Sequence, residues 1–145
     1  MLRVYLDTNV WCRPFDEQIQ KRIIEETDAF FKTLRKVDRG EATIIGSGIL
    51  IEEIEAIEEG KKKELVQELM QMAIFEWVDG VPDLYKDIKQ TGLKLPDSIH
   101  LACAIENAEY FISVDDDILK KGKEIERLYK IKVVNPIDFL KIEGE

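Results

Sequence analysis

Short runs of consecutive apolar residues alternate along the chain with longer segments in which apolar residues recur every three or four positions. The apolar runs predict strands at residues 2–6, 42–45, 74–78, 110–114 and 131–134. The other segments predict helices, at residues 16–37, 47–59, 61–72, 82–90 and 96–107, and a short helix after each of the last two strands. Continuously apolar strands that alternate with helices indicate a mainly parallel sheet covered on both faces. We therefore expect an α/β fold.

The expected helices carry apolar stripes and end signals. The first helix has the longest stripe, formed by Ile19, Ile23, Ile24, Phe30, Phe31, Leu34 and Val37. Gly40 and Gly60 sit where the first and second helices would end, and Ser47 predicts the N-cap of the second. On the third helix we expect Leu65, Leu69 and Met72 to face the core.

Length and composition favour one domain spanning residues 1–145. The net charge of -9, from 30 acidic and 21 basic residues, gives no general attraction for nucleic acid phosphates. Two cysteines far apart in sequence and one histidine suggest neither a disulfide framework nor a zinc site. No apolar run is long enough to span a membrane and the first residues do not read as a signal peptide, so we expect a cytoplasmic protein.

Acidic residues follow two of the expected strands. Asp7 ends the run VYLD, and Asp115, Asp116 and Asp117 follow YFISV. The carboxyl ends of parallel strands form the edge of the sheet at which α/β proteins bind ligands. Aspartate is also a common helix cap and turn former, which explains either position equally well on its own.

Two further carboxylates belong to expected helices. Asp97 follows Pro96 in the first turn of the most apolar helix, where free backbone amides and the helix dipole already stabilise it. Glu53 lies beside the apolar stripe of its helix, whereas Glu58 and Glu59 suit a solvated face.

The combination of these residues is more informative than each alone. Asp7, Glu53, Asp97 and Asp115 come from four elements that we expect to meet at one edge. Carboxylates brought together repel one another and lose solvation, unless they are protonated, paired with basic groups or bound to cations. Oxygen ligands suit hard cations, so the pattern predicts a site for one or two Mg²⁺ or Mn²⁺ ions.

The segments that contain these residues resemble motifs of PIN-domain ribonucleases, including the VapC-type toxins of toxin-antitoxin pairs, over nearly the whole chain. VYLDTNV resembles the opening strand of that family with its first metal-binding aspartate, here Asp7. SGILIEEI resembles the segment that ends in a metal-binding glutamate, which favours Glu53 over Glu52. KVVNPIDFL resembles the last strand and the final helix.

LPDSIHLACAIENAEYFISVDDDI is the most specific of these motifs. It is similar to the segment that holds the third and fourth acidic residues of the family, here Asp97 and Asp115, and it makes Asp117 a further candidate ligand. Ser113 and Val114 stand where many relatives carry Thr and Asn.

The resemblance implies a three-layer α/β/α fold and hydrolysis of RNA phosphodiester bonds that depends on Mg²⁺ or Mn²⁺. The ions would activate the attacking water and offset charge on the scissile phosphate. The implied catalytic residues are Asp7, Glu53, Asp97 and Asp115. The implied partners are RNA, a second copy of the chain and an antitoxin protein.

Polar and basic residues near the motifs supply supporting candidates. Thr8, Asn9 and Ser113 could orient the carboxylates or a water, although turn and cap hydrogen bonds also explain them. Arg13 and Lys94 could contact RNA phosphates, although solvated surface charge explains each of them more simply.

His100 and the two tryptophans rank lower. His100 lies one helical turn after Asp97 and faces similarly, but a lone helical histidine is more often a packed residue. Core packing or a protein interface explains Trp11 and Trp77 better than stacking on bases.

Three alternatives stay open. A haloacid dehalogenase-type phosphotransfer enzyme would want a second carboxylate two residues after Asp7, where this chain has Asn9. A PIN scaffold that only binds protein or RNA would be expected to lose acidic ligands. The third alternative concerns the biological role: the chain is either a toxin held by an antitoxin or a nuclease that processes cellular RNA.

Overall fold

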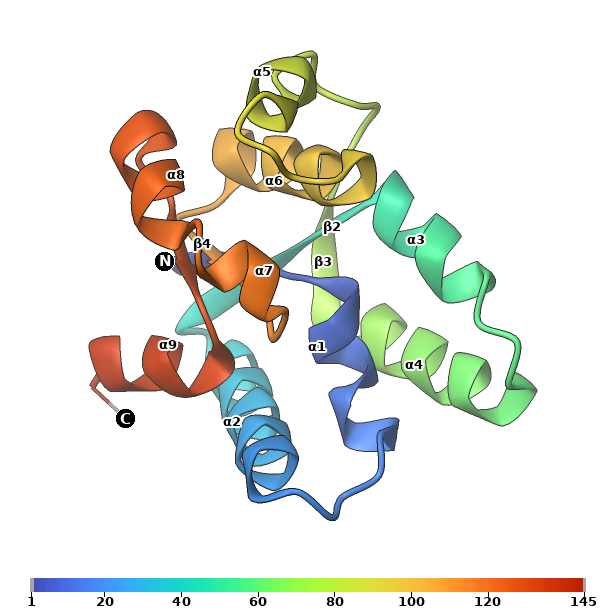
Figure 1. The fold of residues 1–145 in the computed structure, drawn as a ribbon. Coiled ribbons are helices and arrows are strands. Elements are labelled where there is room, and N and C mark those ends of the chain that lie inside the picture. Colours follow the sequence, from blue (N-terminus) through green and yellow to red (C-terminus); the bar gives the residue numbers. More distant parts are fainter. Residues whose placement is uncertain (1, 145) are drawn as a thin grey trace.

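A computed structural model describes residues 2–144, apart from the side chain of Phe75, as a sheet flanked by helices (Figure 1). The strands are β1 (Leu2–Leu6), β2 (Ala42–Ser47), β3 (Ile74–Val78), β4 (Tyr110–Ile112) and β5 (Lys132–Val134). The helices are α1 (Thr8–Cys12), the 3-10 helix η1 (Arg13–Phe15), α2 (Lys21–Asp38), α3 (Gly48–Glu55), α4 (Gly60–Ala73), α5 (Tyr85–Lys89), α6 (Leu95–Asn107), α7 (Asp116–Leu119), α8 (Gly122–Tyr129) and α9 (Pro136–Ile142). Within residues 2–144, no helix combines the length and the apolarity needed to cross a lipid bilayer.

All strand pairings are parallel, and the order across the sheet is β3-β2-β1-β4-β5. In the central strand β1, Val4 lies opposite Ile44 of β2 and Tyr110 of β4. The carboxyl ends of these three strands therefore share one edge of the sheet. The structure confirms the α/β fold with helices on both faces.

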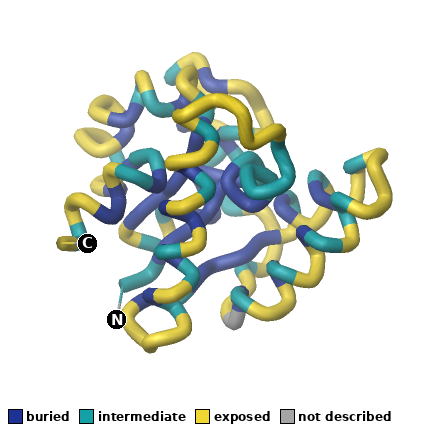
Figure 2. Tube along the Cα trace, turned by 90° about the horizontal axis from the view of Figure 1, so that it is seen from below, coloured by how far each residue is buried: buried dark blue, intermediate teal, exposed yellow. Residues whose placement is uncertain are grey.

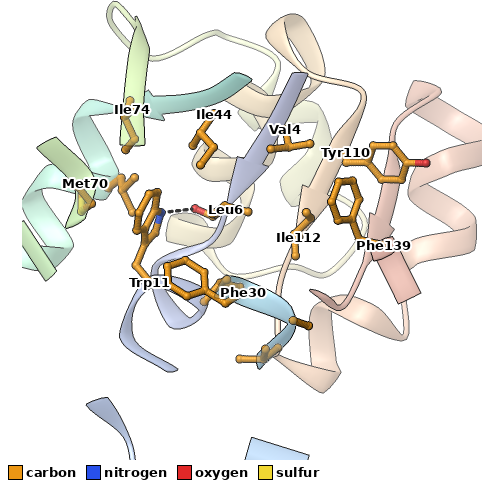
Figure 3. Close-up of a cluster of buried hydrophobic side chains, with 14 of the residues drawn as sticks. Val4, Leu6, Trp11, Phe30, Ile44, Met70, Ile74, Tyr110, Ile112 and Phe139 are labelled. Atoms are coloured by element: carbon orange, nitrogen blue, oxygen red, sulfur yellow. Dashed lines mark hydrogen bonds between the residues drawn. The ribbon is translucent and has the colours of Figure 1, made fainter. Parts of the chain in front are cut away.

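One hydrophobic core fills the space between a face of the sheet and helices α1, α2, α4 and α9 (Figure 3). The sheet contributes Leu6 and Ile112 to it. Trp11 of α1 is fully buried, with its ring edge-on to Phe30 at a centroid distance of 5.7 Å. Its indole N–H donates a hydrogen bond to the carbonyl of Leu6 at 3.2 Å, so the buried donor is satisfied. Trp11 is a core residue, as the sequence analysis favours.

A second core lies on the opposite face, between the sheet and helices α5, α6, α7 and α8. Because side chains alternate along a strand, Tyr5 points to this face while Val4 and Leu6 point to the first. Tyr5 stacks on Phe111 of β4 at a centroid distance of 5.6 Å. Figure 2 shows the consequence, with buried segments in the middle of the molecule and exposed segments around them.

The first long helix starts later than the apolar spacing predicts. Residues 8–15 form α1 and η1, and α2 begins at Lys21. The side-chain amide of Gln18 donates hydrogen bonds to the carbonyls of Arg13 and Asp16, which holds the connecting turn. Ile19 therefore precedes the helix and is 78% exposed, although its spacing matched the stripe.

The expectations for Gly60 and Met72 were also wrong. The carboxylate of Glu59 accepts hydrogen bonds from the backbone N–H groups of Lys61 and Lys62 at 3.1 and 2.9 Å, so Glu59 is the N-cap of α4 and Gly60 its first residue. Met72 is 73% exposed, because the buried side of α4 is the one that carries Val66 and Met70.

Candidate metal centre

Asp7 follows β1 and is buried at the start of α1. Its Oδ1 accepts a hydrogen bond from the backbone N–H of Thr8 at 2.8 Å. Its Oδ2 accepts hydrogen bonds from Nδ2 of Asn9 at 3.1 Å and from Oγ of Ser113 at 2.9 Å. Burial raises the pKa of Asp7, although the neighbouring imidazole of His100 and the hydrogen bond from Ser113 oppose this shift. The carboxylate is thus held in place but poorly solvated, and its charged form would gain from a bound cation.

Glu53 of α3 meets Asp7 at this edge of the sheet. Its Oε1 accepts hydrogen bonds from Oγ1 of Thr8 and from Nε2 of His100, both at 2.5 Å. Burial tends to raise the pKa of Glu53, but the hydrogen bonds from His100 and Thr8 outweigh it, and the net pKa shift is downward. The neighbouring Glu52 is exposed. Glu53 is therefore the glutamate of this pair that contacts the centre.

Asp97 and Asp115 line one pocket at this edge, outside the close group of ligand atoms that Asp7, Glu53 and His100 form in the described residues. Asp97 lies in the first turn of α6, and Asp115 caps α7 by accepting a hydrogen bond from the backbone N–H of Asp117 at 2.9 Å. Burial, the charge of Asp7 and the charge of Asp115 together raise the pKa of Asp97 to about 6. The charge of Glu53 acts in the same direction. These carboxylates are therefore close enough to repel one another appreciably.

A pocket of about 470 Å³ opens beside these carboxylates. Asp97, Asp115 and Asp117 line it together with Lys94, Lys120 and Lys121. A pocket that combines carboxylates with ammonium groups can hold cations on one side and a phosphate on the other.

The two basic residues expected to contact RNA differ in their surroundings. Lys94 lines the pocket, whereas the guanidinium of Arg13 donates to Glu26 at 2.9 and 2.7 Å and to Asp16 at 3.2 Å. We therefore leave Arg13 out of the candidate RNA surface. Lys120 lies in the pocket and escaped the sequence analysis, because a lysine at a helix end carries no distinguishing signal.

His100 lies closer to the carboxylates than its low rank in the sequence analysis implied. Nε2 of His100 is 3.9 Å from Oδ1 of Asp7, and the potential ligand atoms of Asp7, Glu53 and His100 all lie within 4.8 Å of one another. The side chain of His100 is buried. Its helical spacing from Asp97 was the available sequence signal.

Tyr5 and Ser47 form a buried layer behind His100. Oη of Tyr5 is 2.6 Å from Nδ1 of His100 and 2.6 Å from Oγ of Ser47. Both residues are fully buried. Sequence reasoning missed them because Tyr5 belongs to an apolar strand and Ser47 was fully explained as an N-cap, a role that it also has toward Leu50.

The turn after β4 is tied to the turn after β1. Oδ1 of Asn9 accepts a hydrogen bond from the backbone N–H of Val114 at 3.2 Å, and Oγ of Ser113 accepts one from the backbone N–H of Asp115 at 3.1 Å. These bonds explain why β4 ends at Ile112 rather than at the expected residue 114. The side chain of Val114 is buried in the core that contains Leu6 and Ile112.

Comparisons with known proteins agree with this architecture. The sequence model of the PIN domain family matches residues 4–124. The comparison with curated proteins found no match. The fold is similar to that of a chain in the crystal structure of VapBC2 from Rickettsia felis bound to a DNA fragment from their promoter. That similarity has a TM-score of 0.61 and 16% sequence identity, and it covers 92% of this chain and 98% of that chain. Because the PIN model matches most of its length, this chain belongs to the PIN domain family.

Proposed function

We propose that this chain is a ribonuclease that hydrolyses RNA phosphodiester bonds with Mg²⁺ or Mn²⁺ held by Asp7, Glu53, Asp97 and Asp115. The observation that carries the proposal is the effect of these carboxylates on one another. The charges of Asp7, Asp115 and Glu53 all contribute to the raised pKa of Asp97. Such a cluster persists at neutral pH most easily when cations neutralise it.

The chemistry of the donor set fits these ions. Carboxylate oxygens suit Mg²⁺ and Mn²⁺, which bind one or two carboxylates each and keep several waters. Within residues 2–144, no lysine or arginine forms an ion pair with any of the four carboxylates, and the imidazole of His100 is the basic group beside Asp7 and Glu53. The cluster therefore has the charge and the ligand type that hard cations require.

The residues around the cluster have separable tasks in this proposal. Ser113 and Asn9 orient Asp7, and Thr8 orients Glu53. When bound, the ions would supply an activated water and offset charge on the scissile phosphate. Asp117 serves as a further ligand candidate because it lines the pocket with Asp97 and Asp115.

The lysines of the pocket support binding of RNA. The net charge of -9 gives the molecule no general attraction for phosphates. Lys94 and Lys120 beside the acidic cluster provide the local positive charge that a phosphodiester substrate needs.

The fold similarity to a chain of a VapBC2 complex supports a role as the toxin of a cytoplasmic toxin-antitoxin pair, with residues 1–145 acting as one PIN domain. Exposed apolar side chains support protein partners, an antitoxin and a second copy of the chain. Phe31 and Met72 line one surface groove, and Trp77, which is 43% exposed, lines another. If no antitoxin copurifies with the chain and no neighbouring reading frame encodes one, the RNA-processing nuclease is favoured instead.

The test is cleavage of a mixed set of single-stranded RNAs by the wild type, Asp7→Asn, Asp97→Asn and Asp83→Asn. Asp83 is an exposed carboxylate before α5 and serves as the matched control. We expect cleavage with Mn²⁺ or Mg²⁺ by the wild type and Asp83→Asn, and a loss of at least about 100-fold in the two site variants. RNA binding without cleavage by the wild type would favour the non-catalytic scaffold. Because Asn9 donates to Asp7 where a haloacid dehalogenase needs a carboxylate, phosphotransfer is the weaker alternative.

A further inference from the structure

The oxygens of Glu53 have different surroundings. Oε1 accepts hydrogen bonds from Thr8 and His100, both at 2.5 Å. None of the hydrogen bonds within residues 2–144 involves Oε2. A carboxylate fixed through one oxygen keeps the other available to a cation. The residues that fix Oε1 therefore decide where Oε2 lies.

Behind His100 the hydrogen bonds continue into the core. Nδ1 of His100 lies 2.6 Å from Oη of Tyr5, which lies 2.6 Å from Oγ of Ser47. Oγ of Ser47 also accepts a hydrogen bond from the backbone N–H of Leu50 at 3.4 Å. Tyr5, His100 and Ser47 are all buried, so their polar atoms depend on one another for hydrogen bonds.

The carboxylate at the end of this chain sets its direction. Oε1 of Glu53 can only accept, so Nε2 of His100 carries a proton and donates it. With the proton of a neutral imidazole on Nε2, Nδ1 is an acceptor and takes a hydrogen bond from Oη of Tyr5. Oη of Tyr5 is in turn the acceptor for the hydroxyl of Ser47, which also lies beside the thiol of Cys103.

The packing around Tyr5 and His100 makes the chain rigid. The Tyr5 ring stacks on Phe111 at a centroid distance of 5.6 Å and meets the imidazole edge-on at 5.7 Å. β1 supplies Tyr5, β2 supplies Ser47 and α6 supplies His100. Three separate elements therefore fix one imidazole, and through it one oxygen of Glu53.

We propose that His100 and Tyr5 are positioning residues for Glu53, and that hydrogen bonds donated from Ser47 through Tyr5 and His100 hold Oε1 so that Oε2 is presented to a divalent cation. The inference rests on the proposed metal site for its purpose. The hydrogen-bond direction itself can be tested without metal. The role assigned to His100 is that of a hydrogen-bond donor and not of a metal ligand.

The first test uses the fact that the chain has one histidine. In protein labelled with ¹⁵N-histidine, every imidazole signal belongs to His100. In metal-free protein at fixed pH we expect a proton on Nε2 and a bare Nδ1 that accepts from Tyr5. A proton on Nδ1 would overturn the directed chain. On addition of Mg²⁺ the Nε2–H should persist, whereas its loss would identify His100 as a ligand and overturn the positioning role.

The second test measures Mn²⁺ affinity by calorimetry in Tyr5→Phe and in its matched control Tyr110→Phe. Each substitution removes one hydroxyl that is hydrogen bonded in the folded protein. Tyr110 belongs to the opposite core, and its Oη donates to Glu143. We expect Tyr5→Phe to weaken Mn²⁺ binding about 10-fold and Tyr110→Phe to leave it unchanged. Equal affinities in wild type and Tyr5→Phe, with the folded state verified by circular dichroism, would overturn the proposal.

Rescue at position 100 separates positioning from simple packing. Nε2 of a glutamine can take the place of Nε2 of His100 as donor, whereas leucine fills space and donates nothing. We expect His100→Gln to retain most of the Mn²⁺ affinity and His100→Leu to lose at least 10-fold. Equal losses in both variants would contradict the donor role. If the wild type binds no metal at all, the proposed function fails, while the ¹⁵N spectrum still decides the direction of the chain.

Discussion

Oγ of Ser113 donates a hydrogen bond to Oδ2 of Asp7 at 2.9 Å, across 106 positions of the sequence. The bond joins the carboxyl end of β4 to that of β1. It belongs to a small network in which Asn9 also donates to Asp7 and accepts from the backbone of Val114. The orientation of the most buried carboxylate of the centre thus depends on the turn after β4.

Removing the Ser113 hydroxyl should weaken the metal site. Ser113→Ala deprives Asp7 of one donor and the backbone N–H of Asp115 of its acceptor. We expect a loss of about 10-fold in Mn²⁺ affinity by calorimetry, because groups that orient a ligand contribute on this scale. Ser113→Thr keeps the hydroxyl and is the control. Equal Mn²⁺ affinities of Ser113→Ala, Ser113→Thr and the wild type would contradict this expectation.

Asp97→Asn should stabilise the metal-free protein at neutral pH. The folded-state pKa of about 6 lies above the ordinary value of 3.8, so the ionised carboxylate opposes folding increasingly as the pH rises between these values. Asp97 is half-buried, and after solvent screening we expect a gain of about 1 kcal/mol in the free energy of unfolding at pH 7.5. Near pH 4 the gain should vanish. Urea unfolding in EDTA at pH 4 and pH 7.5 measures this difference in the free energy of unfolding. If Asp97→Asn is less stable than the wild type at pH 7.5, repulsion between the carboxylates does not destabilise the metal-free protein.

In the presence of Mg²⁺ or Mn²⁺, the wild type should become more stable than Asp97→Asn. The wild type should gain about 2.7 kcal/mol at a free metal concentration of one hundred times the Kd, because only the folded state holds the site. Asp97→Asn should gain less. The gain should fall below pH 6, where protons compete for Asp97. Thermal melts with metal and with EDTA measure these differences, and equal shifts in both proteins would count against Asp97 as a ligand.

Glu26 should be important for stability rather than for metal binding. It is 1% exposed, and it accepts hydrogen bonds from Arg13 at 2.7 Å and from Arg22 at 3.2 Å. Arg22 in turn donates to Asp116 beside the centre. We expect Glu26→Ala to lower the free energy of unfolding by about 2 kcal/mol, because it removes the buried acceptor of two guanidinium groups that keep Asp16 and Asp116 as partners. Glu25→Ala, which removes an exposed partner of Lys21, should change it by less than about 0.5 kcal/mol.

Lys94 and Lys120 should contribute to RNA affinity through contacts with phosphates. Replacing both by alanine should reduce the dependence of RNA binding on salt, by about 0.7 in the logarithmic slope for each lost phosphate contact. Lys89→Ala, on the exposed side of α5, is the control. Fluorescence anisotropy in EDTA over a salt series measures the slope. An unchanged slope in the double variant would remove these lysines from the RNA surface.

The sheet and most helices could be predicted from the sequence because apolar spacing carries that information. The apolar runs form β1 to β5 in the structure, and the apolar helix that starts near Pro96 is correctly located. Helix ends carry a weaker signal in the sequence, because Gly60 fits the end of one helix and the beginning of the next until the cap at Glu59 is known. Spacing also cannot tell that the turn held by Gln18 leaves Ile19 outside the helix.

The acidic residues of the candidate site could be identified, since carboxylates at strand ends stand out against apolar neighbours. The buried residues that position Glu53 could not be identified as such from the sequence. Tyr5 is indistinguishable from a core residue in a strand, and His100 resembles a packed histidine. Only the crossing of β1, β2 and α6 shows that both meet Ser47 and Glu53 in one hydrogen-bonded chain.

The most direct test of the central claim is a calorimetric titration of Mn²⁺ into the metal-free wild type and into Asp7→Asn at pH 7.5. The claim is that the clustered carboxylates form a cation site. We expect saturable binding by the wild type, release of protons on binding, and a loss of affinity of at least about 100-fold in Asp7→Asn. Binding of equal strength by both proteins, or no binding by the wild type, would contradict it.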